Sequence, residues 1–440
     1  MTGSLAAAVF LRGGVYARQW EWSALGISVA AILVLGSASP RDLLFRKQWG
    51  FAVLALLLGW MLIQITPLPP AAVAFLSPHR WQAVRASREV AGFDDRSWTT
   101  LSVAPPATLG RLLDVVPAMA AFIAAGQLAW FWRGRIWLLV APVVMIGWLQ
   151  AVVGLSQFYS MREVRVKSEV ISGTYIYHNH FSGLLEIAFF PAIWWAVSTW
   201  RAGTNRQTQA AVPALKVVLY AGMAACLLAG IVVSQSRMGF VSTIAAVAAT
   251  LLLLLTSLAT TKIRALAVLV IIGVIASLLI FLPTQELVAR FGELAAEDDL
   301  AKDARALIWQ NTTHLIANYP WTGVGLGAYE HGLYEFKTAS PLNTVDYAHN
   351  DYLQVLGELG IPGAALLGAL AVWIVGRALS FATTMRRRSN WELSMGLVGT
   401  FLVLGLHSLA DFNLYLPANA VALAWFAGIA VSLGAKGQPG

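Results

Sequence analysis

Charge and cysteine are scarce in this chain of 440 residues. Only 12% of its residues are charged and 58% are hydrophobic, whereas soluble domains carry about 25% charged residues. This composition excludes an ordinary soluble domain and predicts a polytopic membrane protein. The one cysteine, Cys226, lies inside an apolar run. A single cysteine excludes both a disulfide framework within the chain and a metal site built from several cysteines.

The sequence also lacks the signatures of several enzyme mechanisms. It has no Asp-x-Asp pair, which metal-assisted nucleotide-sugar transferases commonly use, and no Gly-x-Ser-x-Gly elbow. His178 and His180 lie two residues apart, without a cysteine or carboxylate close by in the sequence to complete a zinc site. We therefore expect neither a metal ion nor a cofactor.

Long apolar runs are abundant, and eleven of them can cross about 30 Å of hydrocarbon as helices. A twelfth span could lie in the first 20 residues or in the segment 67–106. No ten-residue alternating pattern typical of a membrane β-barrel appears. We expect an all-α polytopic membrane protein with 11–12 transmembrane helices. The eleven runs lie near residues 22–38, 49–66, 107–131, 136–157, 181–200, 215–234, 238–258, 265–282, 361–380, 393–410 and 418–434.

Lys and Arg residues in short loops predict the orientation of these spans. If the eleven spans alternate, five basic groups fall on one side, which is then cytoplasmic. The groups lie at 41–47, 133–135, 201–216, 262–264 and 386–388. We thus divide the chain into transmembrane helices with outer segments 67–106 and 158–180 (residues 1–282), an outer loop that carries catalytic residues (283–360), and C-terminal transmembrane helices (361–440).

Basic residues also occur on the predicted outer side, against the usual rule. Arg162, Arg165 and Lys167 lie in the segment 158–180, and four arginines lie in the segment 67–106. Anionic lipid headgroups or a diphosphate-bearing lipid would favour such cations. Neighbouring acids such as Glu163 and Glu169 could instead neutralise them, so both explanations stay open.

Three residues on the predicted outer side could carry chemistry. His349 ends the polar loop just before the chain re-enters the membrane, Arg237 lies in a short polar break between two spans, and Arg305 lies early in a helix predicted over 302–319. Each has a plain alternative, because a histidine can be a structural hydrogen-bonding group and an arginine can snorkel to the interface. Together, a base and cations that hold a diphosphate suffice for glycosyl transfer without a metal. Three carboxylates accompany them: Asp351, Glu358 and Asp411.

A glycine cluster follows the predicted loop helix. Gly323, Gly325 and Gly327 alternate with Val324 and Leu326, but no strand precedes them and no Lys-Ser/Thr pair ends the run, as a phosphate-binding loop would require. We interpret the cluster as a turn that allows close approach of another chain segment or of substrate.

Over about residues 230–420 the chain resembles the O-antigen ligase (Wzy-C) superfamily of bacterial inner-membrane proteins. The most specific match is the block His349-Asn350-Asp351-Tyr352-Leu353-Gln354 with Glu358-Leu359-Gly360-Ile361-Pro362-Gly363. Further matches are Ser236-Arg237-Met238-Gly239, Arg305 with Trp309, Gly323-Val324-Gly325-Leu326-Gly327, and Asp411-Phe412-Asn413-Leu414 with Pro417.

The resemblance implies a GT-C-like, all-helical glycosyltransferase with its active site at the periplasmic face. Such enzymes take a glycan from undecaprenyl diphosphate and pass it to an acceptor without a metal ion. By motif match, His349 is the general base and Arg237 and Arg305 bind the diphosphate. Glu358 and Asp411 orient these groups or balance their charge.

The acceptor distinguishes the members of this superfamily. We favour a ligase that uses the lipid A–core of lipopolysaccharide. The length of the chain is one reason, and the other is that its basic outer segments suit a phosphorylated acceptor. A polymerase that extends a lipid-linked repeat unit is the alternative. A transporter, the alternative from a different class, should carry ionisable residues within its spans, and here Asp114 and Glu186 are the main candidates. We expect membrane lipids, the lipid-linked donor and lipid A–core as partners, and no nucleic acid.

Overall fold

The computed structural model describes residues 1–39, 43–44, 48–94, 96–164, 170–204, 211–255, 299–338, 344–384 and 390–433. Throughout these residues the chain is helical, with one isolated bridge between Leu68 and Thr99 in place of any sheet. Seven helices are long and apolar enough to cross a membrane, and three shorter apolar helices accompany them. The all-α polytopic fold expected from composition is confirmed.

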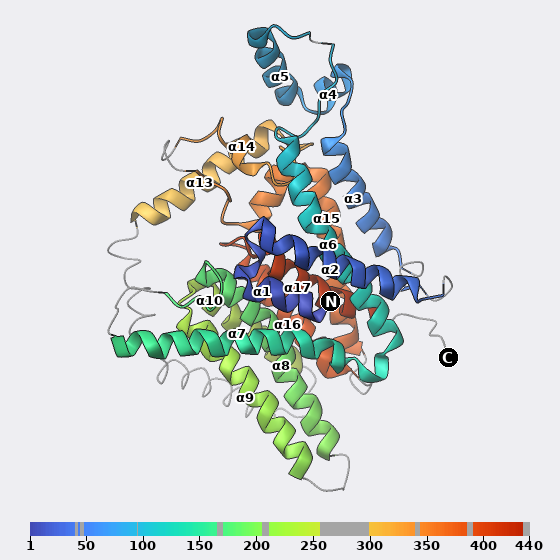
Figure 1. The fold of residues 1–440 in the computed structure, drawn as a ribbon, viewed down its shortest axis with the longest axis vertical. Coiled ribbons are helices and arrows are strands. Elements are labelled where there is room, and N and C mark those ends of the chain that lie inside the picture. The colour runs from blue at the N-terminus through green and yellow to red at the C-terminus, as the bar shows by residue number, and fades with distance from the viewer. Residues whose placement is uncertain are drawn as a thin grey trace.

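Ten of the eleven predicted spans coincide with helices, and the run 265–282 lies outside the described residues. The helices are α2 (Ala17–Gly36), α3 (Gly50–Ile65), α6 (Pro105–Phe131), α7 (Trp137–Val164), α8 (His178–Thr204), α9 (Ala211–Val233), α10 (Arg237–Leu255), α15 (Asp351–Thr384), α16 (Trp391–His407) and α17 (Pro417–Ser432). α6 packs along α17, and α8 packs against both α9 and α16. In Figure 1, α8 and α9 extend together to the lower end of the molecule.

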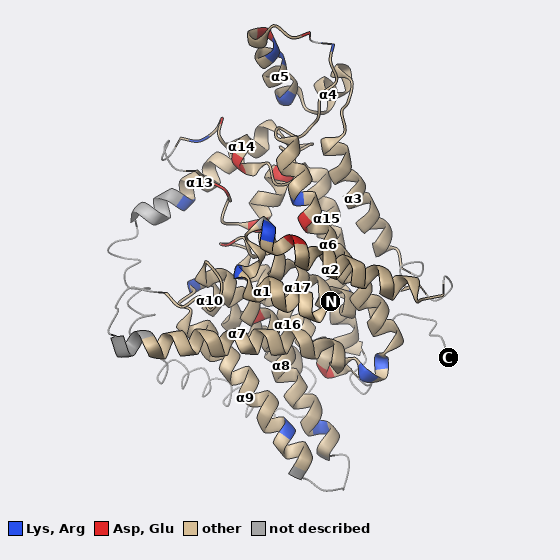
Figure 2. Cartoon of the chain, in the orientation of Figure 1, with Lys and Arg blue, Asp and Glu red and all other residues tan. Residues whose placement is uncertain are grey.

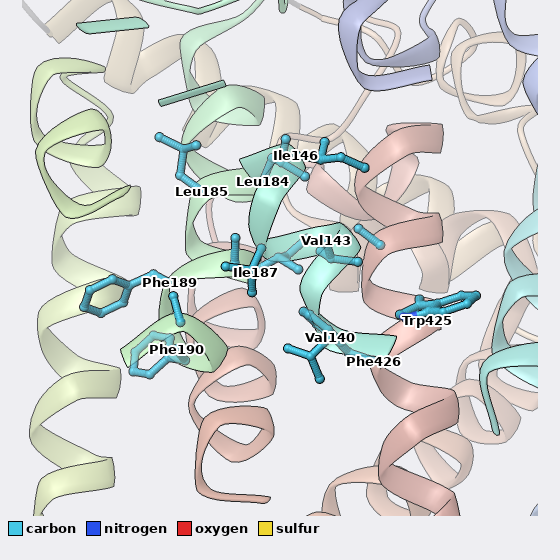
Figure 3. Packing of buried hydrophobic residues seen from close by; sticks show 14 of the residues in the cluster. Val140, Val143, Ile146, Leu184, Leu185, Ile187, Phe189, Phe190, Trp425 and Phe426 are labelled. Carbon is cyan, nitrogen blue, oxygen red and sulfur yellow. The ribbon is translucent and has the colours of Figure 1, made fainter. Parts of the chain in front are cut away.

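The core consists of aliphatic and aromatic side chains where three of these helices meet. Figure 3 shows Val140, Val143 and Ile146 of α7 facing Leu184 and other residues of α8 and α17. These buried side chains pack against one another at the close-packed density of protein interiors. This core fixes the position of the first turns of α8, which carry polar residues of the site.

Neither place suggested for a twelfth span holds one. α1 (Thr2–Phe10) has nine residues and is about 14 Å long, too short to cross. It turns back through a short helical turn, η1 (Arg12–Gly14), and lies beside α2 and α17. The segment 67–106 forms two short helices, α4 (Pro70–Leu76) and α5 (Pro78–Ala91). They project from one end of the molecule (Figure 1).

The long polar loop ends in a helix rather than in irregular chain. α13 (Asp299–Asn318) and α14 (Tyr329–Leu333) precede α15, which begins at Asp351, ten residues before its apolar run. α15 is broken at Gly360, where φ is 63° and ψ is −178°. Figure 2 shows basic residues on the lower parts of α8 and α9, and acidic residues near α14 and α15.

The glycine cluster fills the break in α15. The Val324 amide donates to the Gly357 carbonyl (2.9 Å), and the Ile361 amide donates to the Pro320 carbonyl (2.8 Å). A Cβ on Gly323 would collide with the Glu358 carbonyl, and one on Gly360 would lie 2.6 Å from the backbone of Trp321. The close approach that the glycines were expected to allow is therefore that of another chain segment.

Candidate active site

The imidazole of His349 lies at the junction of the polar loop and α15. Its backbone has φ of 50°, in the left-handed region that is uncommon for residues other than glycine. Its ring is half-buried and meets the ring of Phe412 edge-on, with 5.0 Å between centroids. A strained conformation of this kind persists only where neighbouring contacts hold it.

Asn350 supplies part of that support as the N-cap of α15. Its side-chain oxygen accepts hydrogen bonds from the amides of Tyr352 (3.0 Å) and Leu353 (3.1 Å). Its side-chain nitrogen donates to the carbonyl of Leu409 (2.9 Å). One side chain thus stabilises the start of the helix and connects it to the turn after α16.

Asp351 makes a second connection to the same turn. It is 2% exposed. One carboxylate oxygen accepts hydrogen bonds from the Ser408 hydroxyl (2.7 Å) and the Leu414 amide (3.3 Å). The Asp351 amide itself donates to the carbonyls of Ser408 and Asp411. The acid beside His349 therefore holds the loop against the segment 408–414.

Gln354 and Glu358 continue this support along α15. The Gln354 side chain accepts a hydrogen bond from the Ala348 amide (2.6 Å) and donates to Glu358 (2.9 Å). Glu358 is 1% exposed and also accepts a hydrogen bond from the Tyr415 hydroxyl (2.8 Å). Most polar groups of the His349-to-Glu358 block thus bond within the fold and fix the residues on either side of the imidazole.

Arg305 approaches His349 from α13. The indole nitrogen of Trp309 donates to the carbonyl of Ala348 (2.9 Å), directly before His349. Arg305 lies four residues earlier on the same helix, so it shares the face of Trp309, and it is exposed. Its charge acts on the imidazole of His349. The structure thus brings together two residues that are more than forty positions apart in the sequence.

Arg237 is the first residue of α10, which packs against α16. Two residues later, Gly239 lies against α8, because a Cβ there would be 2.7 Å from a carboxylate oxygen of Glu186. The glycine of the Ser236–Gly239 motif therefore permits close packing of Arg237's helix on the polar cluster behind the site.

That cluster is a row of buried ionisable side chains. Nδ1 of His407 lies 3.0 Å from both carboxylate oxygens of Glu186, and its Nε2 lies 3.6 Å from Asp411. Asp411 in turn lies 3.9 Å from Nε2 of His180. All four side chains are at most 2% exposed. The row connects the first turns of α8 to the end of α16, next to Phe412.

Burial and neighbouring charges together set the protonation of His349 and Asp411. Burial lowers the pKa of His349 below its usual value near 6.5, the charge of Asp411 opposes this shift, and the charge of Arg305 adds to it. Burial alone would raise the pKa of Asp411, but the nearby His407 and His180 bring it below its usual range. Near neutral pH, His349 is therefore unprotonated and Asp411 ionised, a state in which an imidazole can accept a proton.

A cavity of about 350 Å³ lies on the other side of Tyr347. Tyr347 stacks on Phe412 with 4.1 Å between ring centroids, and Phe412 also contacts His349. Arg111 of α6 lines this cavity, donates to the carbonyl of Tyr415 (3.0 Å) and places its guanidinium over the Tyr415 ring. The cavity and the His349 site thus have Tyr347 in common.

The basic residues of the segment 158–180 are only partly described. Arg162 lies in the last turn of α7, but its side chain is outside the described residues. Arg165 and Lys167 lie wholly outside them. Their assignment to substrate binding stays a prediction, as do the roles of the other site residues.

Two residues near the site escaped the sequence analysis. His180 had no partner close by in sequence, whereas the fold places it beside Asp411, more than two hundred positions away. Arg111 lies in the apolar run of α6, and no motif marked it. The charge of Arg111 within a span was the one available signal, since ionisable residues there generally have a function.

Comparison with protein families gives one match. The model of the O-antigen ligase family, Wzy_C, matches residues 222–368. This range runs from α9 to the middle of α15 and includes Arg237, Arg305 and His349. No curated protein matches the chain. The match, together with the polytopic helical fold, supports membership of the O-antigen ligase superfamily.

Proposed function

We propose that this protein is a glycosyltransferase that moves a glycan from undecaprenyl diphosphate to the lipid A–core of lipopolysaccharide. We place it in the bacterial inner membrane with the site facing the periplasm, and we assign the reaction to protein groups alone, without a metal ion. The observation that carries the proposal is that α13 and the start of α15, joined by the Trp309–Ala348 hydrogen bond, bring the charge of Arg305 to act on the His349 imidazole.

In the proposed reaction His349 acts as general base. It removes the proton from the acceptor hydroxyl while that oxygen attacks the anomeric carbon of the donor sugar. The bond between this carbon and the diphosphate oxygen breaks, and its electron pair leaves with the diphosphate. Arg237 and Arg305 offset the charge that develops there. A single displacement of this kind inverts the anomeric centre.

The three carboxylates have positioning roles in this scheme. Asp351 and Glu358 are buried and hydrogen-bonded within the fold, so we assign them to holding His349 and its loop. The ionised Asp411 stabilises the imidazolium that forms when His349 accepts the proton. Arg162, Arg165 and Lys167 remain candidates for the phosphorylated parts of the substrates.

Transfer by the purified protein tests the proposal. Undecaprenyl diphosphate-linked glycan would be offered in detergent with lipid A–core in one reaction and without it in another. Glycosylated lipid A–core is the expected product. Lengthening of the lipid-linked glycan with no change to lipid A–core would instead establish a polymerase. Absence of any transfer, with intact donor bound, would contradict both and favour a transporter.

A further inference from the structure

We propose that the cavity beside Tyr347 is a subsite for one sugar unit that carries no phosphate, either neutral or amino-bearing. This inference rests on the proposed glycosyl transfer, and it assigns the sugar and the diphosphate to separate places. The cavity is defined by residues of five parts of the chain, listed here: Gly14, Val15, Trp20, Ala107, Arg111, Asp114, Gly327, Glu330, Asp346, Tyr347, Gln354, Glu358, Tyr415, Leu416 and Pro417.

The size of the cavity suits a small polar ligand. Its volume of about 350 Å³ lies at the lower end of the range for small-molecule sites, roughly 300–1,000 Å³. One sugar ring fits such a volume better than a branched oligosaccharide or a lipid chain. The exposed carboxylates of Glu330 and Asp346 in the lining also disfavour a lipid chain, which would exclude water from them.

The lining combines aromatic rings with hydrogen-bonding groups. Tyr347 is half-buried and offers a partly open aromatic surface, on which the C–H face of a sugar ring can pack. Glu330 and Asp346 offer exposed carboxylates for its hydroxyls, and the guanidinium of Arg111 offers donors. Sugar hydroxyls both donate and accept hydrogen bonds, so this mixture matches them.

The balance of charge disfavours a phosphate. Four carboxylic acids line the cavity against one guanidinium, that of Arg111. Arg111 already donates to the Tyr415 carbonyl and to Asp114 (3.4 Å). Glu330 and Asp346 are exposed at the cavity and would repel an entering anion. The cations assigned to the diphosphate, Arg237 and Arg305, do not line it.

Two stacked or edge-on aromatic rings connect the cavity to the proposed base. Tyr347 lines the cavity and stacks on Phe412, which His349 contacts. The charge of Asp346, another lining residue, acts on His349. The N-terminal turn forms part of the cavity wall through Gly14. Gly14 has φ of 78° and packs closely on Trp20, since a Cβ on it would lie 3.2 Å from the Trp20 ring. A sugar held here would therefore be separated from the imidazole by the rings of Tyr347 and Phe412.

Binding of free sugars to the full chain in lipid nanodiscs tests the inference without requiring transfer. The probes are glucose, glucosamine and glucose 6-phosphate, and saturation-transfer difference NMR reports which of them contacts the protein. Glucose and glucosamine should bind, and glucose 6-phosphate should bind at least about tenfold more weakly. Equal or tighter binding of glucose 6-phosphate would overturn the proposal.

Two variants and a control assign the binding to this cavity. Ala107→Phe fills it and should abolish the glucose signal. Glu330→Lys changes an exposed residue, so folding is not in question, and should shift the preference toward glucose 6-phosphate by roughly tenfold. Glu89→Lys makes the same charge change on α5, outside the cavity, and should behave as the wild type. An unchanged preference in Glu330→Lys would refute the assignment.

A transfer assay with the same variants identifies the source of the sugar. A rise in KM for the acceptor in Glu330→Lys means that the acceptor sugar occupies the cavity, and a rise in KM for the donor means that the donor glycan does. An unchanged KM for both overturns the inference while leaving the proposed function intact. Conversely, the expected sugar binding without any transfer would refute the proposed function alone.

Discussion

Replacing Gln64 by leucine should loosen the packing that holds the broken helix near the site. Gln64 lies near the end of α3 and is fully buried. Its side-chain nitrogen donates to the carbonyls of Thr322 and Glu358, both at 2.8 Å, and its side-chain oxygen accepts from the Leu326 amide at 3.1 Å. One side chain thus connects α3, the glycine cluster and the break in α15.

The magnitude follows from the partners that leucine would leave behind. The Glu358 carbonyl keeps a hydrogen bond from Gly325, but the Leu326 amide and the Thr322 carbonyl would lose the bonds described above. Each buried polar group left without a partner costs about 1–3 kcal/mol. Leucine has nearly the same size, so little cavity forms. For two such groups we therefore expect a loss of about 2–6 kcal/mol in the stability of this region.

Hydrogen–deuterium exchange measured by mass spectrometry in detergent provides the assay. A loss of about 2–6 kcal/mol corresponds to exchange roughly 30- to 20,000-fold faster in peptides that cover residues 320–330. Peptides from α8 should be unaffected. Gln82→Leu, the same substitution at an exposed position of α5, should change nothing. Unaltered exchange at 320–330 in Gln64→Leu would refute the role assigned to these hydrogen bonds.

Three further predictions concern the residues around the imidazole. Gly360→Ala should lower the stability of the fold by about 3 kcal/mol or more, because the backbone conformation of Gly360 is open essentially only to glycine. Thermal unfolding measures this loss. Gly368→Ala, a control with open space around the residue, should be neutral or slightly stabilising in the same assay. Asn350→Ala should cost about 1 kcal/mol of helix capping and lower kcat. Asn318→Ala, on the exposed end of α13, should leave kcat unchanged. Equal kcat values for the two variants would contradict the role of the Asn350 cap. Glycan transfer should require neutral His349, whose pKa lies below 6.5 because of burial. The transfer rate should therefore stay level from pH 8 to pH 7 and decline only in more acidic buffer. A decline that begins above pH 7 would count against this histidine as the base.

Hydropathy predicted the helices well because lipid and the apolar core of the bundle both require long runs of apolar side chains. The start of α15 was harder to place, since Asp351, Gln354 and Glu358 make residues 351–360 look like a polar loop. These side chains are buried because they bond to Ser408, Ala348 and Tyr415. A hydropathy profile contains no information about such partners.

The candidate site shows the same division between local and distant information. His349 and Arg237 were singled out because each is a charged or titratable group beside a predicted span, and Arg305 because it lies in the helix predicted within the outer loop. His180 and Glu186 became part of the arrangement only through packing of α8 against α16, which brings them to Asp411 and His407. Pairing of this kind depends on how helices far apart in sequence meet, and one sequence does not determine it.

The most direct test of the account is the initial rate of glycan transfer by His349→Ala in the presence of EDTA. The account predicts a fall of about a hundredfold or more, as expected for loss of a general base, while wild type keeps its rate with EDTA. His314→Ala, an exposed histidine of α13, should retain the wild-type rate. Near-normal transfer by His349→Ala, or loss of wild-type activity on chelation, would contradict a metal-independent reaction with His349 as its base.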